Sequence, residues 1–433
     1  MMDFRRYFGP MPGRREAHAM AWMALTAGVI LCAASVVLGF QGRTFMGRAL
    51  GGDFVEFYTI GKILNTLPAA KIYDLELAVK LQHEILPTMA KTQMLVFGQT
   101  PYVAWLFRPF ALLPYTWAYV AWLAFSAALY VAGLKVLFAA AHLNRQDRHT
   151  GFLLALSFSP FLFETWIGGQ MATVVFFIWA LFLWCMENER DFVAGLALSL
   201  CLFKPTLVAL PAAMLFLARR WRLVSGLATG SAALALGSFF TVGWDGCRAW
   251  FAMLAFNAQV AAATGDAWHR SKYVDMVAFF RLLLGSHQTI VGVVLAGVAV
   301  AALGWLGRAW WRLGLNPVPN QLWAVTLCFT LVISAYTPIY DAVLAVTAIA
   351  LLAAKRQEFE ERDRDALAAC ILLLYMVSWL TQVFAEFLHI QLITLVLAGL
   401  GCWAGTLMPT YSKTEREEST MPRPLQPRVA GRF

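Results

Sequence analysis

Long apolar runs, separated by short loops that carry arginine, are the feature of this sequence that most limits how the chain can fold. Of its 433 residues, 60% are hydrophobic and only 14% are charged. A soluble globular protein has about a quarter charged residues, so this composition cannot supply an ordinary water-exposed surface. Apolar runs of about 20 residues span the hydrocarbon core when they are helical. The sequence therefore predicts an all-α, polytopic membrane protein.

The charges in the loops predict how these helices are oriented. Four arginines precede the first apolar run, Met20–Phe40, and the short loops assigned to the same side carry arginine at almost every turn. Because basic residues are enriched in cytoplasmic loops, we expect the N-terminus inside and about 11 membrane elements. The first run is longer than a typical cleaved signal peptide, which favours an uncleaved span. We expect one domain over residues 1–410 and a disordered inside tail over residues 411–433.

The net charge of +9 does not indicate a nucleic-acid partner, because the basic residues lie between apolar runs. In that position they are typical of topology signals and of contacts with anionic membrane lipids. Most of the seven cysteines fall within or at the ends of apolar runs, and none pair at metal-ligand spacing. We therefore expect membrane lipids around the protein, no disulfide framework and no metal site.

Two regions are expected on the outer side. Residues 41–100 form the longest stretch without a span, and residues 244–288 form a second region that is too polar in its middle to cross. In the first region, Asp53 and Glu56 are three residues apart, which places both acids on one face of a helix that starts at Asp53. An amphipathic helix of this kind lies in the membrane interface, where an acid could act as a general base. The same spacing is also a capping box, in which Glu56 reaches back to an Asp53 cap.

Two apolar pieces of about 12 residues, Phe192–Phe203 and Thr206–Leu217, meet at Lys204–Pro205. Each piece is too short to cross a membrane, so the pair predicts a hairpin with Lys204 at its tip. The tip would point into the membrane or to its outer face. A lysine there could hold a phosphate as a point charge. Alternatively, it extends to lipid head groups or pairs with a nearby acid.

Other polar residues have two interpretations each. Asp341 follows Tyr340 at the start of a late span, where it is a candidate functional acid or a helix N-cap. Glu164, near the tight turn Gly168–Gln170, is expected at the membrane interface. The basic residues of the second outer region could bind an anionic group or be ordinary exposed side chains: His269, Arg270, Lys272 and Arg281.

Several motifs that identify other enzyme classes do not occur in the sequence: GxxxxGK[ST], HExxH and GxSxG. The carboxylates and bases collect in the outer regions rather than within the spans, where a transporter usually places its proton relay. This distribution favours an enzyme that uses a lipid-linked donor at the membrane surface. A transporter or flippase of a lipid-linked or anionic substrate is the alternative, and a purely structural membrane protein is a third.

Five segments of the chain resemble glycosyltransferase family 87: DFVEFYTIGKIL…AAKIYD, FRPFALLP, GGQMATVVFF, VAGLALSLCLFKPTLVALPAAMLFLARRWR and PIYDAVLAVTAIALL. The resemblance runs from about Asp53 to Leu352. The most specific part of the resemblance is that three motifs follow one another in this order along the chain: a Gly-Gln turn, Ala-Gly…Lys-Pro, and Arg-Arg-Trp-Arg. One departure is Thr100-Pro101, where the family usually has Tyr-Pro-Pro.

The resemblance implies an integral membrane enzyme of the GT-C type, located in the cell inner membrane. Such an enzyme moves a sugar, typically mannose, from a polyprenyl-phosphate donor to a glycan or lipid acceptor at the outer face, with inversion and without a cofactor or a metal. The resemblance implies that Asp53 is the catalytic acid and that Glu56 is its neighbour. The residues expected at the donor phosphate are Lys204, Arg270 and Lys272, and those expected at the substrate are Gln170, Tyr340 and Asp341.

Overall fold

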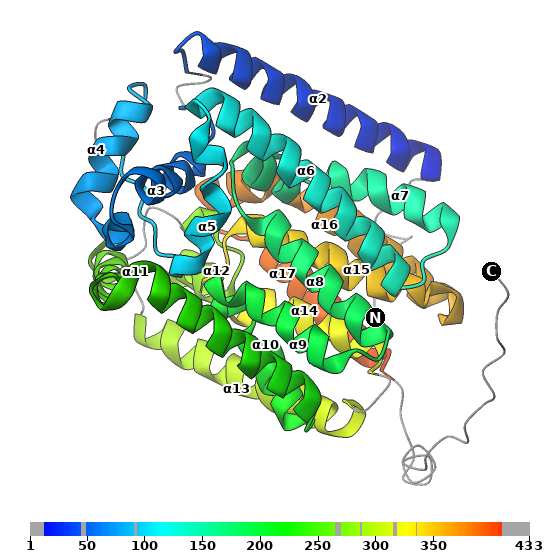
Figure 1. The fold of residues 1–433 in the computed structure, drawn as a ribbon. Helices are drawn as coiled ribbons and strands as arrows, with labels where there is room; N and C mark the ends of the chain where they lie inside the picture. Colours follow the sequence, from blue (N-terminus) through cyan, green and yellow to red (C-terminus); the bar gives the residue numbers. More distant parts are fainter. Residues whose placement is uncertain are drawn as a thin grey trace, which may run out of the picture.

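The computed structural model describes most of the chain, namely residues 13–44, 49–90, 93–264, 270–285, 288–314, 318–334 and 336–408. Over these residues the regular elements are helices, with one isolated bridge between Tyr273 and Pro338. Figure 1 shows that the longer helices run side by side as one bundle. The all-α prediction is confirmed. The predicted inside tail, residues 411–433, lies outside the described residues.

Among the described residues, five helices are long and apolar enough to cross a membrane: α2 (Arg14–Phe40), α6 (Tyr115–Ala140), α11 (Trp221–Thr264), α13 (Gln288–Leu313) and α16 (Glu361–Phe387). A bent pair, α7 (Arg145–Leu156) and the π-helical η4 (Pro160–Ile167), would make a sixth span. Apolar side chains face outward on these helices; Phe240 is 80% exposed and Val300 is 70% exposed. Such a surface fits lipid better than water, so the protein is a multi-pass membrane protein.

The remaining predicted membrane elements, including the two hairpin pieces, correspond to shorter apolar helices: α8 (Ala172–Glu187), α9 (Asp191–Ser199), α10 (Ala209–Leu217), α14 (Asn320–Ile333), α15 (Ala345–Ala354) and α17 (Leu392–Thr406). Because a straight helical span needs about 20 residues, these lengths do not confirm the expected 11 membrane elements. Some of these helices form the core; every residue of α14 from Gln321 to Val332 is buried.

Helix α11 does not end where the sequence predicted the second outer region to begin. At Gly243 the backbone turns into the left-handed region, with φ of 66°, and this kinks the helix. The chain then stays helical to Thr264. The first part of the region predicted as 244–288 therefore continues the helix beyond the kink. Glycine tolerates this φ without steric cost, which explains why the kink falls at this residue.

The hairpin predicted around Lys204–Pro205 is present. The chain passes from α9 through η5 (Leu200–Phe203) and η6 (Pro205–Leu207) into α10. At the open end of the hairpin, the Arg220 guanidinium donates to both carboxylate oxygens of Asp191 at 3.0 Å. This part-buried ion pair joins the two chain ends, so Lys204 lies at the opposite, closed end.

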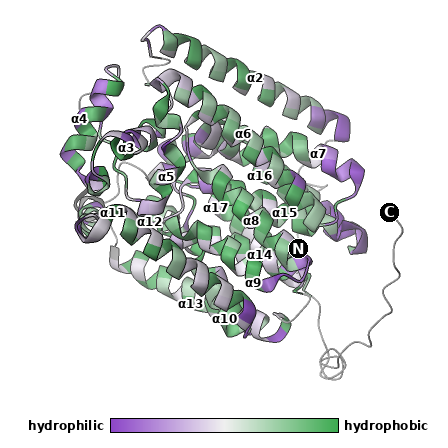
Figure 2. Cartoon of the chain, viewed as in Figure 1, coloured by the Kyte–Doolittle hydropathy of each residue, from purple (hydrophilic) through white to green (hydrophobic). Residues whose placement is uncertain are grey.

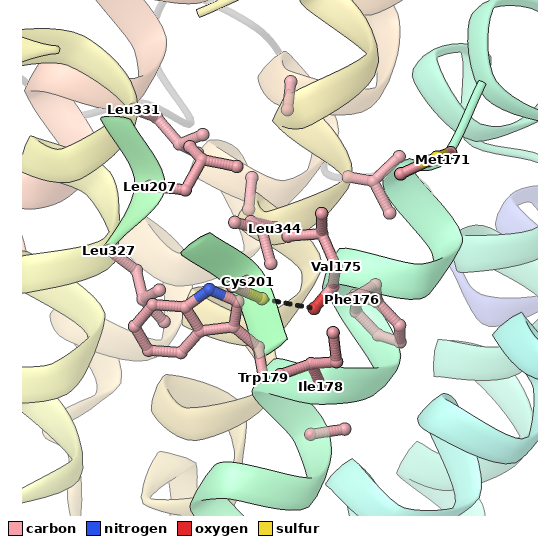
Figure 3. Packing of buried hydrophobic residues seen from close by; sticks show 14 of the residues in the cluster. Met171, Val175, Phe176, Ile178, Trp179, Cys201, Leu207, Leu327, Leu331 and Leu344 are labelled. Carbon is pink, nitrogen blue, oxygen red and sulfur yellow. Dashed lines mark hydrogen bonds between the residues drawn. The ribbon is translucent and has the colours of Figure 1, made fainter. Parts of the chain in front are cut away.

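A packed apolar layer supports the closed end of the hairpin (Figure 3). The Cys201 thiol lies 4.0 Å from the Val175 carbonyl of α8, and Trp179 of the same helix is fully buried beside it. Leu207 and Leu327 close this layer from η6 and α14. Close packing of this kind leaves little room for rearrangement, and it fixes the backbone on both sides of Lys204.

The bundle has two polar ends (Figure 2). The N-termini of α2, α7 and α16 lie at one end, which we call the α7 end; there Arg14 pairs with Asp147 at 3.1 Å. Helices α3 (Phe54–Thr66) and α4 (Leu75–Ile85) lie at the other, which we call the α3 end. Asp74 caps α4 by accepting from the Leu77 N–H at 3.2 Å.

The prediction that α3 lies on the membrane surface is wrong. Its Phe57 ring stacks on Phe107 with centroids 4.7 Å apart, and even Glu56 is only 9% exposed. The segments that cover α3 are α5 (Ala104–Phe107) and η3 (Phe110–Leu112). Both segments pack on the apolar face of α3, where Phe54 and Phe57 lie against Phe107.

Candidate active site

Two diglycine turns bring Asp53 and Gln170 together at the α3 end. Gly51–Gly52 directly precede Asp53, and Gly168–Gly169 directly precede Gln170. The Asp53 backbone N–H donates to the Gly168 carbonyl at 3.0 Å. The side-chain amide of Gln170 donates to the Asp53 carboxylate. The structure thus places two predicted site residues, 117 positions apart in the chain, in direct contact.

The glycines are needed because the two turns meet backbone to backbone. Gly169 has a φ of 74°, and a Cβ built there would lie 2.6 Å from both the Gly51 carbonyl oxygen and the Phe54 Cβ. A left-handed φ costs an L-residue about 1–2 kcal/mol before any overlap is counted. No residue with a side chain fits this position without moving Asp53 or Gln170.

Gly169→Ala is therefore expected to lower the free energy of unfolding by more than about 2 kcal/mol and to reduce activity. Gly237→Ala is the matched control, because a Cβ there meets nothing within 4 Å and Gly237 lies inside a helix. The control should be neutral or slightly stabilising, as alanine is the better helix former. Thermal unfolding in detergent checks both variants; equal midpoints would show that the close approach of the turns is unimportant.

The capping-box interpretation of Asp53 is wrong. Asp53 is the N-cap residue of α3 by position, but its carboxylate makes no capping hydrogen bond to the first turn. Its side chain instead accepts from Gln170. The carboxylate thus faces the Gly168–Gln170 turn rather than its own helix.

Glu56 differs in environment from Asp53. Burial raises the pKa of Glu56 well above its usual value of 4.5, and the negative charge of Asp53 raises it further. The two neighbouring carboxyl groups therefore differ: Asp53 is half-buried and accepts a hydrogen bond from Gln170, whereas Glu56 is buried. Environments that separate two carboxyl groups in this way commonly assign them different roles.

Glu56→Gln should flatten the pH dependence of stability. An acid whose pKa is raised on folding stabilises fully below its unfolded pKa, near 4.5, and this contribution is lost as the pH rises towards the folded pKa. Over this window the wild type should lose up to about 1.4 kcal/mol per pH unit relative to the variant. Thermal midpoints measured from about pH 4 to about pH 8 check this; parallel curves would contradict it.

A second cluster joins the hairpin tip to η8 (Ile339–Leu344). The Lys204 ammonium donates to the Asp341 carboxylate at 2.5 Å and lies 4.3 Å from the centre of the Tyr340 ring. Lys204 is 8% exposed and Asp341 is 2% exposed, so the pair is shielded from water. Lys204 was predicted to bind a phosphate, to extend to lipid head groups or to pair with an acid. In the structure it pairs with an acid. The partner, Asp341, is itself a predicted site residue.

The π-helical η4 connects the two clusters. The Thr165 hydroxyl donates to the Pro160 carbonyl at 2.8 Å and lies 3.5 Å from the Tyr340 carbonyl. Two residues further on, η4 ends at the turn that carries Gln170. Glu164, expected at the interface, accepts from Gln382 of α16 at 2.7 Å and so ties the same element to the bundle.

Hydrogen bonds join the second outer region to the segment that precedes Tyr340. Asp275, only 1% exposed, accepts from the Thr337 N–H at 2.9 Å and caps α12 (Met276–Leu284) by accepting from the Ala278 N–H. The Val274 N–H donates to the Thr337 carbonyl at 2.8 Å. Sequence reasoning did not select Asp275, although an aspartate directly before an apolar helical run is a start signal.

These hydrogen bonds position η7 (Arg270–Lys272) beside the segment that leads to Tyr340. Lys272 is exposed there. Arg281 lies in the last turn of α12, away from η7 along the chain. His269 lies outside the described residues, and for Arg270 the structure describes the backbone only.

Tyr336, which sequence reasoning also missed, indicates how the parts are related. Desolvation of its hydroxyl raises the pKa of Tyr336, its hydrogen bond with Tyr273 lowers it, and the charges of the carboxylates Glu56, Asp341 and Asp53 raise it further. The Tyr336 side chain is 57% exposed, and its ring lies 4.8 Å from that of Tyr273, whose backbone pairs with Pro338 beside Tyr340. The two clusters and Tyr336 form one candidate active site.

Comparison with protein families identifies the chain. The family model for glycosyltransferase family 87 matches residues 97–338, more than half of the sequence. The match contains Gln170 and Lys204, whereas Asp53 precedes it and Asp341 follows it. No curated protein and no solved structure matches the chain. The resemblance inferred from the five segments is confirmed, and the chain belongs to glycosyltransferase family 87.

Proposed function

We propose that this glycosyltransferase moves a sugar, mannose or another hexose or pentose, from a polyprenyl-phosphate donor to a glycan or lipid acceptor. The observation that carries the proposal is the meeting of the Asp53–Gln170 pair and the buried Lys204–Asp341 pair at one end of an apolar bundle. A donor with a long hydrocarbon chain can reach such a site from the bilayer, with its sugar at the polar end of the bundle.

Asp53 is the proposed general base. Its carboxylate takes the proton from the acceptor hydroxyl while that oxygen bonds to the anomeric carbon of the sugar. The bond from this carbon to the phosphate oxygen breaks on the opposite face, which gives inversion and releases the polyprenyl phosphate. Glu56 suits a different role, because its raised pKa favours the protonated form, which donates a hydrogen bond and accepts no proton.

The departing phosphate requires positive charge in a poorly solvated place. Lys204 is proposed for this role together with Arg270 and Lys272 of η7. Asp341 holds the Lys204 ammonium, so a bound phosphate would share Lys204 with Asp341. Lys272 is exposed and suits first contact with the donor, whereas Lys204 is fixed and suits orientation of the phosphate. Gln170 and Tyr340 complete the proposed substrate contacts.

The proposal places one GT-C-type domain, residues 1–410, in the cell inner membrane with the α3 end outside. Thiol labelling of intact cells tests this orientation. Thr66, at the end of α3, and Arg145, on α7, are both exposed, so labelling of a cysteine at either position depends on which side of the membrane it lies. With a membrane-impermeant reagent, Thr66→Cys should be labelled and Arg145→Cys should not. Labelling of Arg145→Cys alone would reverse the orientation and contradict an outward-facing site.

A donor panel tests the reaction itself. Purified protein in nanodiscs should release polyprenyl phosphate from one labelled polyprenyl-phosphate sugar and transfer the sugar to an acceptor. Nucleotide sugars serve as the comparison. Transfer from a nucleotide sugar only would contradict the lipid-linked donor, and movement of intact donor across the bilayer would support the transporter alternative instead.

A further inference from the structure

A cavity of about 290 Å³ lies at the α7 end, away from the candidate active site. Helices α2, α6, α7, α15 and α16 contribute to its wall. Its inner surface is mainly aliphatic and aromatic, with Leu154, Phe158, Ile349 and Ile371 among the lining residues. The volume is at the lower end of the range for small-molecule sites, about 300–1,000 Å³.

The deep part of the cavity offers apolar contact and little else. Its polar group, the Tyr375 hydroxyl, bonds with the Ser157 hydroxyl at 3.0 Å. Ser157 in turn donates to the Leu153 carbonyl at 2.7 Å. Because these groups are already satisfied within the protein, a ligand gains no hydrogen bond from them. A hydrocarbon chain is the occupant that fits this part.

The mouth of the cavity is basic. Arg14, Arg356 and Arg364 line it around a single acid, Asp147. Arg14 lies 3.1 Å and Arg356 lies 3.8 Å from the Asp147 carboxylate, and both arginines remain about half exposed. Three guanidinium groups around one carboxylate leave an excess of positive charge. Guanidinium groups bind phosphate with paired hydrogen bonds.

One wall of the cavity faces lipid on its outer side. Helix α2 forms one of its walls, and only 11% of the apolar window of α2 is buried. For the other four long helices this share is between 17% and 39%. The wall formed by α2 is therefore the one least held by the rest of the protein, and it borders the bilayer.

From this combination of an apolar interior, a basic mouth and a wall that borders the bilayer, we propose that the cavity binds an anionic membrane phospholipid. One acyl chain enters the cavity, and the phosphate lies among Arg14, Arg356 and Arg364. This lipid is distinct from the sugar donor, because the site lies at the opposite end of the bundle from Lys204 and Asp53. The proposal does not depend on any catalytic assignment.

Lipid retention in detergent tests the proposal. The wild type is equilibrated with an equimolar mixture of phosphatidylglycerol and phosphatidylcholine, and bound lipids are counted by native mass spectrometry. Phosphatidylglycerol should be retained preferentially. The double variant Arg356→Gln/Arg364→Gln should lower its retention about 10-fold or more, since each basic side chain near a lipid head group contributes about 1 kcal/mol.

Two further variants separate charge from shape. Arg362→Gln is the matched control, because Arg362 is exposed on the same helix but does not line the cavity; retention should equal that of the wild type. Ala353→Phe fills the cavity and should lower retention of both lipids. Equal retention of the two lipids by the wild type, or an unchanged preference in the arginine variant, would overturn the proposal. So would a lipid-free dimer that buries this mouth.

Discussion

Asp53→Asn is expected to fold like the wild type and to transfer sugar about 10²–10⁴-fold more slowly. Asparagine keeps an oxygen that accepts from Gln170, and its backbone N–H still donates to Gly168, so the two diglycine turns remain joined. It cannot accept a proton from the acceptor hydroxyl. Initial rates with saturating donor measure the loss, and thermal unfolding in the same detergent shows whether the fold is intact.

Glu56→Gln is the control for this experiment and should slow transfer much less than Asp53→Asn. Glutamine resembles the protonated form that burial favours at Glu56, so the change preserves its shape and its hydrogen-bond donor. An Asp53 that served only as a helix cap would tolerate asparagine, because asparagine caps about as well as aspartate. An Asp53→Asn enzyme with most of its turnover would remove Asp53 as the base and leave Asp341 as the next candidate.

The sequence predicted the helical membrane architecture because apolar length and loop charge are local properties. The hairpin at Lys204–Pro205 could be predicted for the same reason, since two short apolar pieces and a proline lie next to each other in the chain. The environment of α3 could not be predicted in this way. Helical spacing separates the face of α3 that carries Asp53 and Glu56 from its apolar face, but α5 and η3, which pack on the apolar face, lie some 50 residues further along the chain.

The candidate site was predicted as separate residues rather than as pairs. Asp53 contacts Gln170, which is 117 positions away, and Lys204 contacts Asp341, which is 137 positions away. A single sequence does not predict contacts between residues so far apart in the chain. A local signal was nevertheless present. The sequences GGD and GGQ each place two glycines before a polar residue, and glycine pairs of this kind mark close backbone approach.

Lys204→Met is expected to lower the free energy of unfolding by about 3–5 kcal/mol, because it leaves the Asp341 carboxylate buried and unpaired. The double variant Lys204→Met/Asp341→Leu should recover most of this loss, since replacing a buried ion pair by apolar groups is often neutral. Denaturant or thermal unfolding of the two single variants and the double variant gives the coupling between the residues. Independent, additive losses would contradict the buried pair.

The recovered double variant then separates a structural lysine from a lysine that binds the donor. A hydrogen bond to a charged group contributes about 1.5–3 kcal/mol, so loss of a phosphate contact should raise the KM for the donor roughly 10- to 100-fold although the fold is restored. The control is the part-buried Arg220–Asp191 pair at the α7 end, replaced in the same way. Its double variant should keep the wild-type KM. If the Lys204/Asp341 double variant also keeps it, the lysine serves the hairpin alone, and the phosphate contact must come from Arg270 and Lys272.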